Sequence, residues 1–173
     1  NSGNIKMQYQ VQNGNSTQGK SDPKAVAGIN EVLNSLSISQ SEINTKGKID
    51  LTKSATASNG VPVTIKWETS NSRFLAISGK INKQFYGGGS NSVQLKAIGQ
   101  SGYDSAEKIF NVNVPVETVH EMLERASKNI SVSEGYPSSV KVNAHKGMLD
   151  IPISWNGNIA TLKYDNAEYK KQC

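Results

Sequence analysis

The clearest fold signal in this chain is the segment Val63-Thr64-Ile65-Lys66-Trp67-Glu68-Thr69-Ser70-Asn71. Apolar residues alternate with polar ones up to the tryptophan, and a polar turn follows. Because successive side chains of a strand point to opposite faces, Val63, Ile65 and Trp67 share one face. The stretch therefore predicts a β-strand with one buried face that ends in a turn.

The same pattern returns later in the chain. Ile151-Pro152-Ile153-Ser154-Trp155 leads into the turn Asn156-Gly157-Asn158. Two such strands predict two similar β modules, and tandem modules are more typical of a scaffold than of a single-pocket enzyme.

The composition predicts thin cores. Of the 173 residues, 35% are hydrophobic and only 6% are aromatic, so Val, Ile and Leu must supply most of the buried area. Each large aromatic residue then matters, since truncation of a buried Trp costs about 3–5 kcal/mol. The residues expected to anchor the cores are Trp67, Trp155, Ile65 and Phe110.

The charge pattern argues against two classes of partner. The net charge is +5, but lysines are spread along the chain and the two arginines, Arg73 and Arg125, lie far apart. Nucleic-acid binders concentrate charge and interleave aromatic residues, so no nucleic acid is expected. No apolar run approaches the ~18 residues of a membrane span, so direct membrane insertion is not expected either. Solvated surface charge is the first interpretation of these lysines, and weak attraction to an anionic cell-wall polysaccharide is the second.

The cysteine content is one residue, Cys173. An intramolecular disulfide is therefore excluded, and the fold is not a disulfide-stapled miniprotein. A frayed tail residue and a functional thiol both stay open as its role.

Residues 1–114 contain the first part of the predicted organisation. Residues 1–21 form an N-terminal strand at Ile5–Val11 and a linker rich in Asn, Gly and Ser. The next module is predicted at 22–114. It opens with a short helix, since Asp22-Pro23 is a helix start and apolar residues follow at three- and four-residue steps. From Ile38 to Val114, short apolar runs separated by Gly, Asn and Ser clusters predict a β-sandwich.

Residues 115–173 complete the organisation. The apolar positions of 115–130 share one helical face, which predicts a linker helix. Residues 131–173 predict a second small β unit, below the size at which a sandwich normally stands alone. Either other parts of the chain complete it, such as the N-terminal strand, or it is cut short.

Residues 25–114 resemble a known family, the atrophied bacterial immunoglobulin-like domains. The motifs that carry the resemblance, after a short helix, are Ile49-Asp50-Leu51-Thr52, Val63–Asn71, Ile77-Ser78-Gly79-Lys80-Ile81, Val93-Gln94-Leu95-Lys96-Ala97 and Phe110-Asn111-Val112-Asn113-Val114. The chain departs from the family pattern at Thr69, where Ser is common, and at Thr52, where Pro is common. Residues 131–158 more loosely resemble another bacterial immunoglobulin-like type.

The resemblance implies a mostly β fold: an immunoglobulin-like sandwich with a short leading helix, followed by a linker helix and a second small immunoglobulin-like β unit. It also implies a role as spacer, stalk or adhesive module, and it supplies no catalytic residues. The expected function is thus a non-enzymatic structural or adhesive module of a bacterial cell-surface or secreted multidomain protein. The expected partners are neighbouring modules, other surface proteins or cell-wall polysaccharide, and the expected location is extracellular.

The residues themselves give no catalytic, metal or cofactor site. His120-Glu121 lacks a second His four positions on, and Gly87-Gly88-Gly89-Ser90 lacks the lysine of a phosphate loop, so the glycine run predicts a hairpin tip. Asp50, Asp104 and Glu107 do not follow a calcium-loop formula.

Three aromatic residues near turns are the candidates for ligand contact: Phe85, Tyr86 and Tyr103. If Tyr86 and Tyr103 are exposed and coplanar, they favour the alternative function, a carbohydrate-binding accessory module of a secreted glycoside hydrolase. If they only cover the end of the sandwich, the structural function stands.

Overall fold

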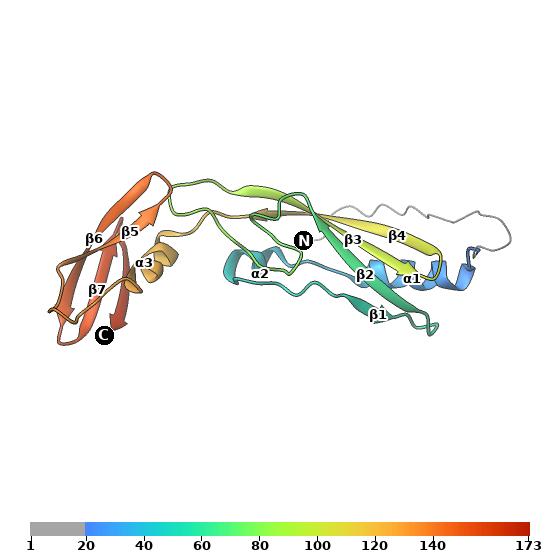
Figure 1. Ribbon diagram of the computed structural model, residues 1–173, viewed down its shortest axis with the longest axis horizontal. Coiled ribbons are helices and arrows are strands. Elements are labelled where there is room, and N and C mark those ends of the chain that lie inside the picture. Colours follow the sequence, from blue (N-terminus) through green and yellow to red (C-terminus); the bar gives the residue numbers. More distant parts are fainter. Residues whose placement is uncertain (1–19) are drawn as a thin grey trace. The chain divides into compact units, whose positions relative to one another are not determined.

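The computed structural model describes residues 20–173, which divide into two compact units. Unit 1 consists of the described residues up to Asn82 together with Asn91–Val114, and unit 2 consists of Lys83–Ser90 and Pro115–Cys173. Each unit holds one four-stranded antiparallel sheet, so the fold is mostly β, as the sequence predicts (Figure 1). The predicted strand Ile5–Val11 and the loop after it lie outside the described residues.

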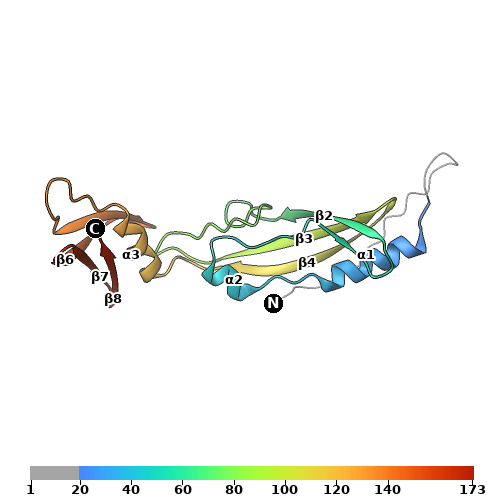
Figure 2. The same cartoon turned by 90° about the horizontal axis from the view of Figure 1, so that it is seen from below.

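Unit 1 combines two helices with a sheet in the strand order β1-β2-β3-β4. Its elements are α1 (Pro23–Ser35), α2 (Gln40–Thr45), β1 (Ser54–Thr56), β2 (Pro62–Thr69), β3 (Asn91–Ser101) and β4 (Asp104–Val114). Figures 1 and 2 show α1 running beside the sheet. The second layer of the sandwich is reduced to α1, α2 and loops joined by two isolated bridges, Lys48↔Lys80 and Leu75↔Ile81.

Helix α1 begins where the sequence predicts. The Asp22 side chain accepts a hydrogen bond from the Lys24 N–H at 3.0 Å, and Pro23 occupies the first helical turn. The apolar stripe that includes Ile29 and Leu33 is buried against the sheet.

Gly28 lowers the intrinsic helix propensity of α1, and the structure gives the reason for its presence. A Cβ atom at this position would lie 2.8 Å from the Cβ of Val61. The helix can therefore approach the β1–β2 connection this closely only because residue 28 has no side chain.

Strand β2 places Val63, Ile65 and Trp67 in the core of unit 1. The Trp67 ring lies 5.9 Å from that of Phe110 on β4, and its indole N–H donates to the Thr52 carbonyl oxygen at 2.8 Å. Thr52, where the sequence departs from the family pattern, thus supplies the backbone acceptor for the N–H of the buried indole.

Unit 2 is an antiparallel meander with a helix packed on it. Its elements are α3 (Val119–Ser127), β5 (Ser139–Ala144), β6 (Gly147–Asn156), β7 (Ile159–Tyr164) and β8 (Ala167–Gln172), in the sheet order β5-β6-β7-β8. The first part of β6 pairs with β5 and the last part, from Ile153, pairs with β7. Residues 131–173 therefore form one four-stranded antiparallel sheet.

Helix α3 corrects the prediction of a linker helix at 115–130. The predicted apolar face exists, but Met122, Leu123 and Ala126 are fully buried in the core of unit 2. The helix begins with a reciprocal capping box between Thr118 and Glu121. It is a core element of unit 2, because the single sheet leaves one apolar face that needs a cover.

The segment Lys83–Ser90 corrects the predicted boundary of the first module. The sequence places it inside the module at 22–114, between the bridge residue Ile81 and strand β3. The chain instead leaves unit 1 after Asn82, contributes Lys83–Ser90 to unit 2, returns at Asn91 and leaves again after Val114.

Candidate functional site

Backbone hydrogen bonds hold the segment Lys83–Ser90 in unit 2. The Gln84 carbonyl accepts from the Glu117 N–H at 2.9 Å, and the Tyr86 carbonyl accepts from the His145 N–H at 3.0 Å. The Tyr86 N–H donates to Glu117 Oε1 at 3.0 Å. The segment is therefore fixed between the residues before α3 and the turn between β5 and β6.

Charged side chains fix it further. The carboxylate of Glu117, which is buried, accepts two hydrogen bonds from Arg125 at 2.8 and 2.9 Å. The guanidinium of Arg125 also lies 3.7 Å from the centroid of the Phe85 ring. Phe85 is 40% exposed, but this stacking gives its ring a structural role. Lys83 forms an ion pair with Glu121 at 2.8 Å.

Tyr86 is half-buried and packs inward. Its ring meets that of Tyr164 edge to face, with centroids 6.0 Å apart. Its hydroxyl donates to Asp165 Oδ2 at 2.8 Å, and this hydrogen bond is the main reason why the pKa of Tyr86 is raised above its ordinary value of 10.0. Asp165 is held in place by the β7–β8 turn, in which Asp165 and Asn166 have φ angles of 47° and 65°.

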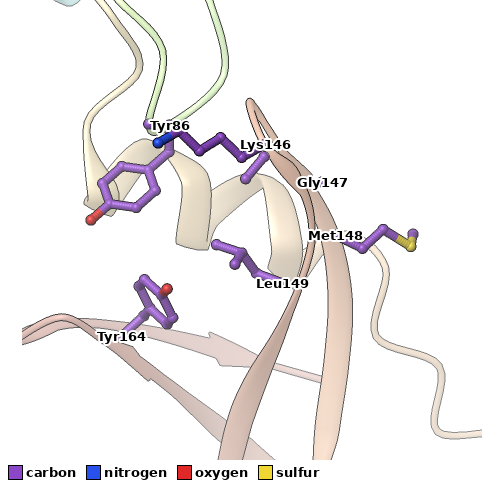
Figure 3. A pocket seen from close by; sticks show the side chains of 8 residues that line it. Tyr86, Lys146, Gly147, Met148, Leu149 and Tyr164 are labelled. Carbon is purple, nitrogen blue, oxygen red and sulfur yellow. The ribbon is translucent and has the colours of Figure 1, made fainter.

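These elements line an open pocket of about 190 Å³ that lies wholly within unit 2 (Figure 3). Most of its lining is apolar. The lining residues are Tyr86, Gly87, Ala144, Lys146, Gly147, Met148, Leu149 and Tyr164.

The polar groups of the pocket are few. Figure 3 shows Lys146 extending toward Tyr86, and the Tyr164 hydroxyl directed toward the space beside Leu149. Within residues 20–173, neither the Lys146 ammonium nor the Tyr164 hydroxyl makes a hydrogen bond or ion pair. The lining therefore offers apolar contact together with one positive charge.

The remaining aromatic candidate, Tyr103, lies elsewhere. It is 49% exposed in the hairpin between β3 and β4 and belongs to unit 1, whereas Tyr86 and Phe85 belong to unit 2.

Trp155 occupies a place in unit 2 like that of Trp67 in unit 1. Its indole N–H donates to the Pro137 carbonyl oxygen at 2.8 Å, as that of Trp67 does to Thr52. Unlike Trp67 it is half-buried, and the exposed ring of Tyr136 stacks on it at 4.5 Å. Strands β2 and β6 thus share both their sequence pattern and the hydrogen bond from the indole N–H to a backbone carbonyl oxygen.

Sequence reasoning selected Tyr86 but missed Lys146, Leu149, Tyr164 and Asp165. The Asp165-Asn166 pair is a recognisable signal for a tight β-hairpin turn. The sequence offers no signal that brings this turn to a loop almost eighty residues earlier.

Unit 1 carries a second, polar groove of about 540 Å³. Its polar side chains are all uncharged: Gln40, Ser70, Ser92, Gln94, Asn111 and Asn113. Gln94 Nε2 donates to Asn111 Oδ1 at 3.1 Å, and the Gln40 amide pairs with both backbone groups of Asn113.

No group of three or more His, Cys, Asp or Glu that could hold a metal ion occurs in residues 20–173. In the same range, no helix is long and apolar enough to cross a membrane.

Comparison with known proteins agrees with the fold of unit 1. The model of the atrophied bacterial Ig domain matches residues 29–117, about half of the chain, and confirms the resemblance found at 25–114. Neither a search of curated proteins nor a search of solved structures found a match. Bacterial Ig-like domains are generally non-catalytic structural modules and are common in extracellular proteins. By this match, the chain belongs to the family of atrophied bacterial Ig domains.

Proposed function

We propose that this protein is a non-enzymatic structural module of a bacterial cell-surface or secreted multidomain protein. It acts by spacing and connecting its neighbours, and its exposed loops and pocket are available for adhesion. The family supports the structural part of this proposal, since its members are built around a folded core rather than an active site.

One observation carries the proposal beyond the family. The segment Lys83–Ser90 interrupts unit 1 in sequence and is fixed in unit 2 by backbone, ionic and aromatic contacts. When unit 1 unfolds, this segment is no longer held at both of its ends, and unit 2 loses part of its framework. The stability of unit 2 therefore depends on a folded unit 1, as suits a spacer that is under tension.

Single-molecule force measurement tests this coupling. Handles are attached to the exposed Cys173 and to a cysteine introduced at the exposed Lys20 (Lys20→Cys). We expect one unfolding event that releases most of the chain, an extension of about 50 nm at roughly 3.4 Å per residue. Two well-separated events of smaller extension would show that the units unfold independently and would overturn the proposed role under tension.

The adhesive part of the proposal concerns partners outside the chain. The partners proposed are neighbouring modules, other surface proteins and cell-wall polysaccharide. Incubation of the purified protein with isolated bacterial cell walls at low and physiological salt tests binding to cell-wall polysaccharide. Retention that survives physiological salt supports such binding. Retention that disappears with salt reports only the net charge of +5 meeting a polyanion.

Carbohydrate binding is the second candidate, and the polar groove of unit 1 favours it. Uncharged amides both donate and accept hydrogen bonds, as sugar hydroxyls require, and the Gln94–Asn111 contact holds two of them in place. Soluble oligosaccharides should then perturb the amide signals of Gln94 and Asn111, and the double variant Gln94→Ala, Asn111→Ala should abolish binding. Absence of perturbation by a panel of cell-wall and plant oligosaccharides would remove this candidate.

A further inference from the structure

The pocket of unit 2 is an exposed concavity whose walls are already fixed. Tyr86 is held by its hydroxyl on Asp165 and by its backbone bonds to Glu117 and His145. Tyr164 is held by strand β7 and by the edge-to-face contact with Tyr86. A ligand therefore meets a preformed site and does not have to order it.

The size of the pocket matches one side chain. Its volume is about 190 Å³, and an apolar cavity of about 150 Å³ is enough to hold a benzene ring. The pocket walls are aromatic or aliphatic and are contributed by Tyr86, Tyr164, Leu149 and Ala144. An apolar group that fills the pocket is therefore stabilised by the removal of its surface from water. An aromatic side chain fits this volume and these walls.

The number of polar groups decides against a sugar at this site. A sugar ring carries hydroxyls around its whole rim, whereas the pocket offers only the side-chain ends of Lys146 and Tyr164 and phenol Tyr86, which is already bound to Asp165. Each buried hydroxyl left without a partner loses its hydrogen bonds to water and weakens binding. A ligand with an apolar body and few polar groups is therefore preferred.

Lys146 decides the charge of the ligand. Its ammonium is without an ionic partner in the described part of the chain and lies at the pocket, and the protein as a whole carries a net charge of +5. A carboxylate close to the aromatic group would pair with Lys146, and the net charge would favour the approach of an acidic partner.

We propose that this pocket is a docking site for a partner protein, which inserts one aromatic side chain and pairs a neighbouring carboxylate with Lys146. The proposal deepens the structural function, since it names the partner chemistry of a module that packs against others. The spacer role does not depend on it: the force measurement can succeed when the docking site fails.

Methyl and amide NMR of the full chain tests the site. The probes are acetyl-Gly-Phe-Asp-Gly-amide, its Asn counterpart and glucuronate, each titrated to millimolar concentration. We expect the Asp peptide to shift the methyl signals of Leu149 and Ala144, and to bind about three- to fivefold more tightly than the Asn peptide, as one exposed ion pair allows. The variant Lys146→Met should abolish that difference, whereas Lys141→Met, at an exposed lysine that faces Asp150, should preserve it.

A second variant checks the apolar part. Ala144→Leu fills the pocket from β5, and it should abolish binding of both peptides while the rest of the spectrum stays that of a folded protein. Three results would overturn the proposal: no shift with either peptide, equal affinity of the two peptides for the native protein, or shifts of the same methyl groups by glucuronate alone.

Discussion

Asp104 and Lys108, four positions apart on the core face of β4, bind opposite ends of helix α1. Asp104 Oδ2 accepts a hydrogen bond from the Asp22 N–H at 2.9 Å, and Lys108 Nζ donates to the Leu36 carbonyl oxygen at 2.6 Å. The two side chains belong to residues that are only 2% and 3% exposed. Since the N-terminal end of a helix is positive and the C-terminal end negative, each charge lies where the helix dipole favours it.

The first prediction concerns Asp104. Asp104→Ala removes the acceptor of the Asp22 N–H and the negative charge at the start of α1. Unit 1 should lose about 2 kcal/mol of unfolding free energy, as for a donor left without its partner. Denaturant unfolding followed by Trp67 fluorescence in a Trp155→Phe background measures this, and Asp50→Ala, at an exposed position of unit 1, serves as the control. Equal stability of the Asp104 variant and its parent would contradict the anchoring role.

Lys108 should behave differently, because its burial is costly. Burial lowers the pKa of Lys108 below its ordinary value of 10.5, so the unfolded chain holds this proton more tightly than the folded one. Its contribution to stability therefore rises as the pH increases from the folded-state pKa toward 10.5. In Lys108→Met this rise should be absent, with little loss of stability at neutral pH, since a methionine fills the same space without a buried charge.

The measurement is the difference in unfolding free energy between parent and Lys108→Met across alkaline pH. The difference cancels the other titrating groups that the two proteins share. If the difference in unfolding free energy does not change with pH, burial does not destabilise the Lys108 ammonium.

The third prediction concerns Gly28. Gly28→Ala improves helix propensity by about 1 kcal/mol, yet the new methyl group would lie 2.8 Å from Val61 Cβ. Overpacking should win and destabilise unit 1 by about 1–2 kcal/mol net. Asn34→Ala, at an exposed position of the same helix, is the control and should not destabilise. A Gly28→Ala variant more stable than its parent would show that α1 can move away from the β1–β2 connection.

The fourth prediction concerns the ion pair that holds Lys83. Burial opposes the ionisation of Glu121, but the hydrogen bonds and charge of Lys83, with the hydrogen bonds at Thr118, lower its pKa below 4.5 overall. The resulting stabilisation is fully present above the unfolded-state pKa and is lost as the pH falls through the folded-state value. Glu121→Gln should remove this part of the acid dependence of the Trp155 signal, whereas Glu124→Gln, at an exposed position of α3, should keep it. Identical acid profiles for all three proteins would refute the contribution of Glu121.

The fifth prediction concerns Tyr86. Tyr86→Ala removes the contact with Tyr164 and the hydrogen bond to Asp165. The unfolding midpoint reported by Trp155 should fall, although Tyr86 belongs to a segment that interrupts unit 1 in sequence. Tyr103→Ala, in an exposed hairpin of unit 1, should leave that midpoint unchanged. An unchanged midpoint in Tyr86→Ala would mean that Lys83–Ser90 does not stabilise unit 2.

The sequence was sufficient for the fold class, because its strands have a clear period. The alternation of Val63, Ile65 and Trp67 predicts the buried face of β2, and the Asp22-Pro23 signal predicts the start of α1. Both signals are local, and the structure has a strand and a helix at these places.

The pocket was less predictable, because it depends on contacts between distant residues. The run Gly87-Gly88-Gly89 has no hydrophobic period, so nothing in the sequence indicates that this loop joins the second unit. The apolar face of α3 was visible, but a helical face does not say which surface covers it, and the helix was wrongly predicted as a linker.

The position of Lys83–Ser90 also has a consequence for inheritance. The family match at 29–117 takes in this segment, whereas most of unit 2 follows the match. A gene rearrangement that moved only the matched residues would carry away a wall of the pocket and the partners of Glu121, Tyr164 and Asp165. A gene duplication that keeps the pocket intact must therefore include both units, a longer piece than the matched residues 29–117.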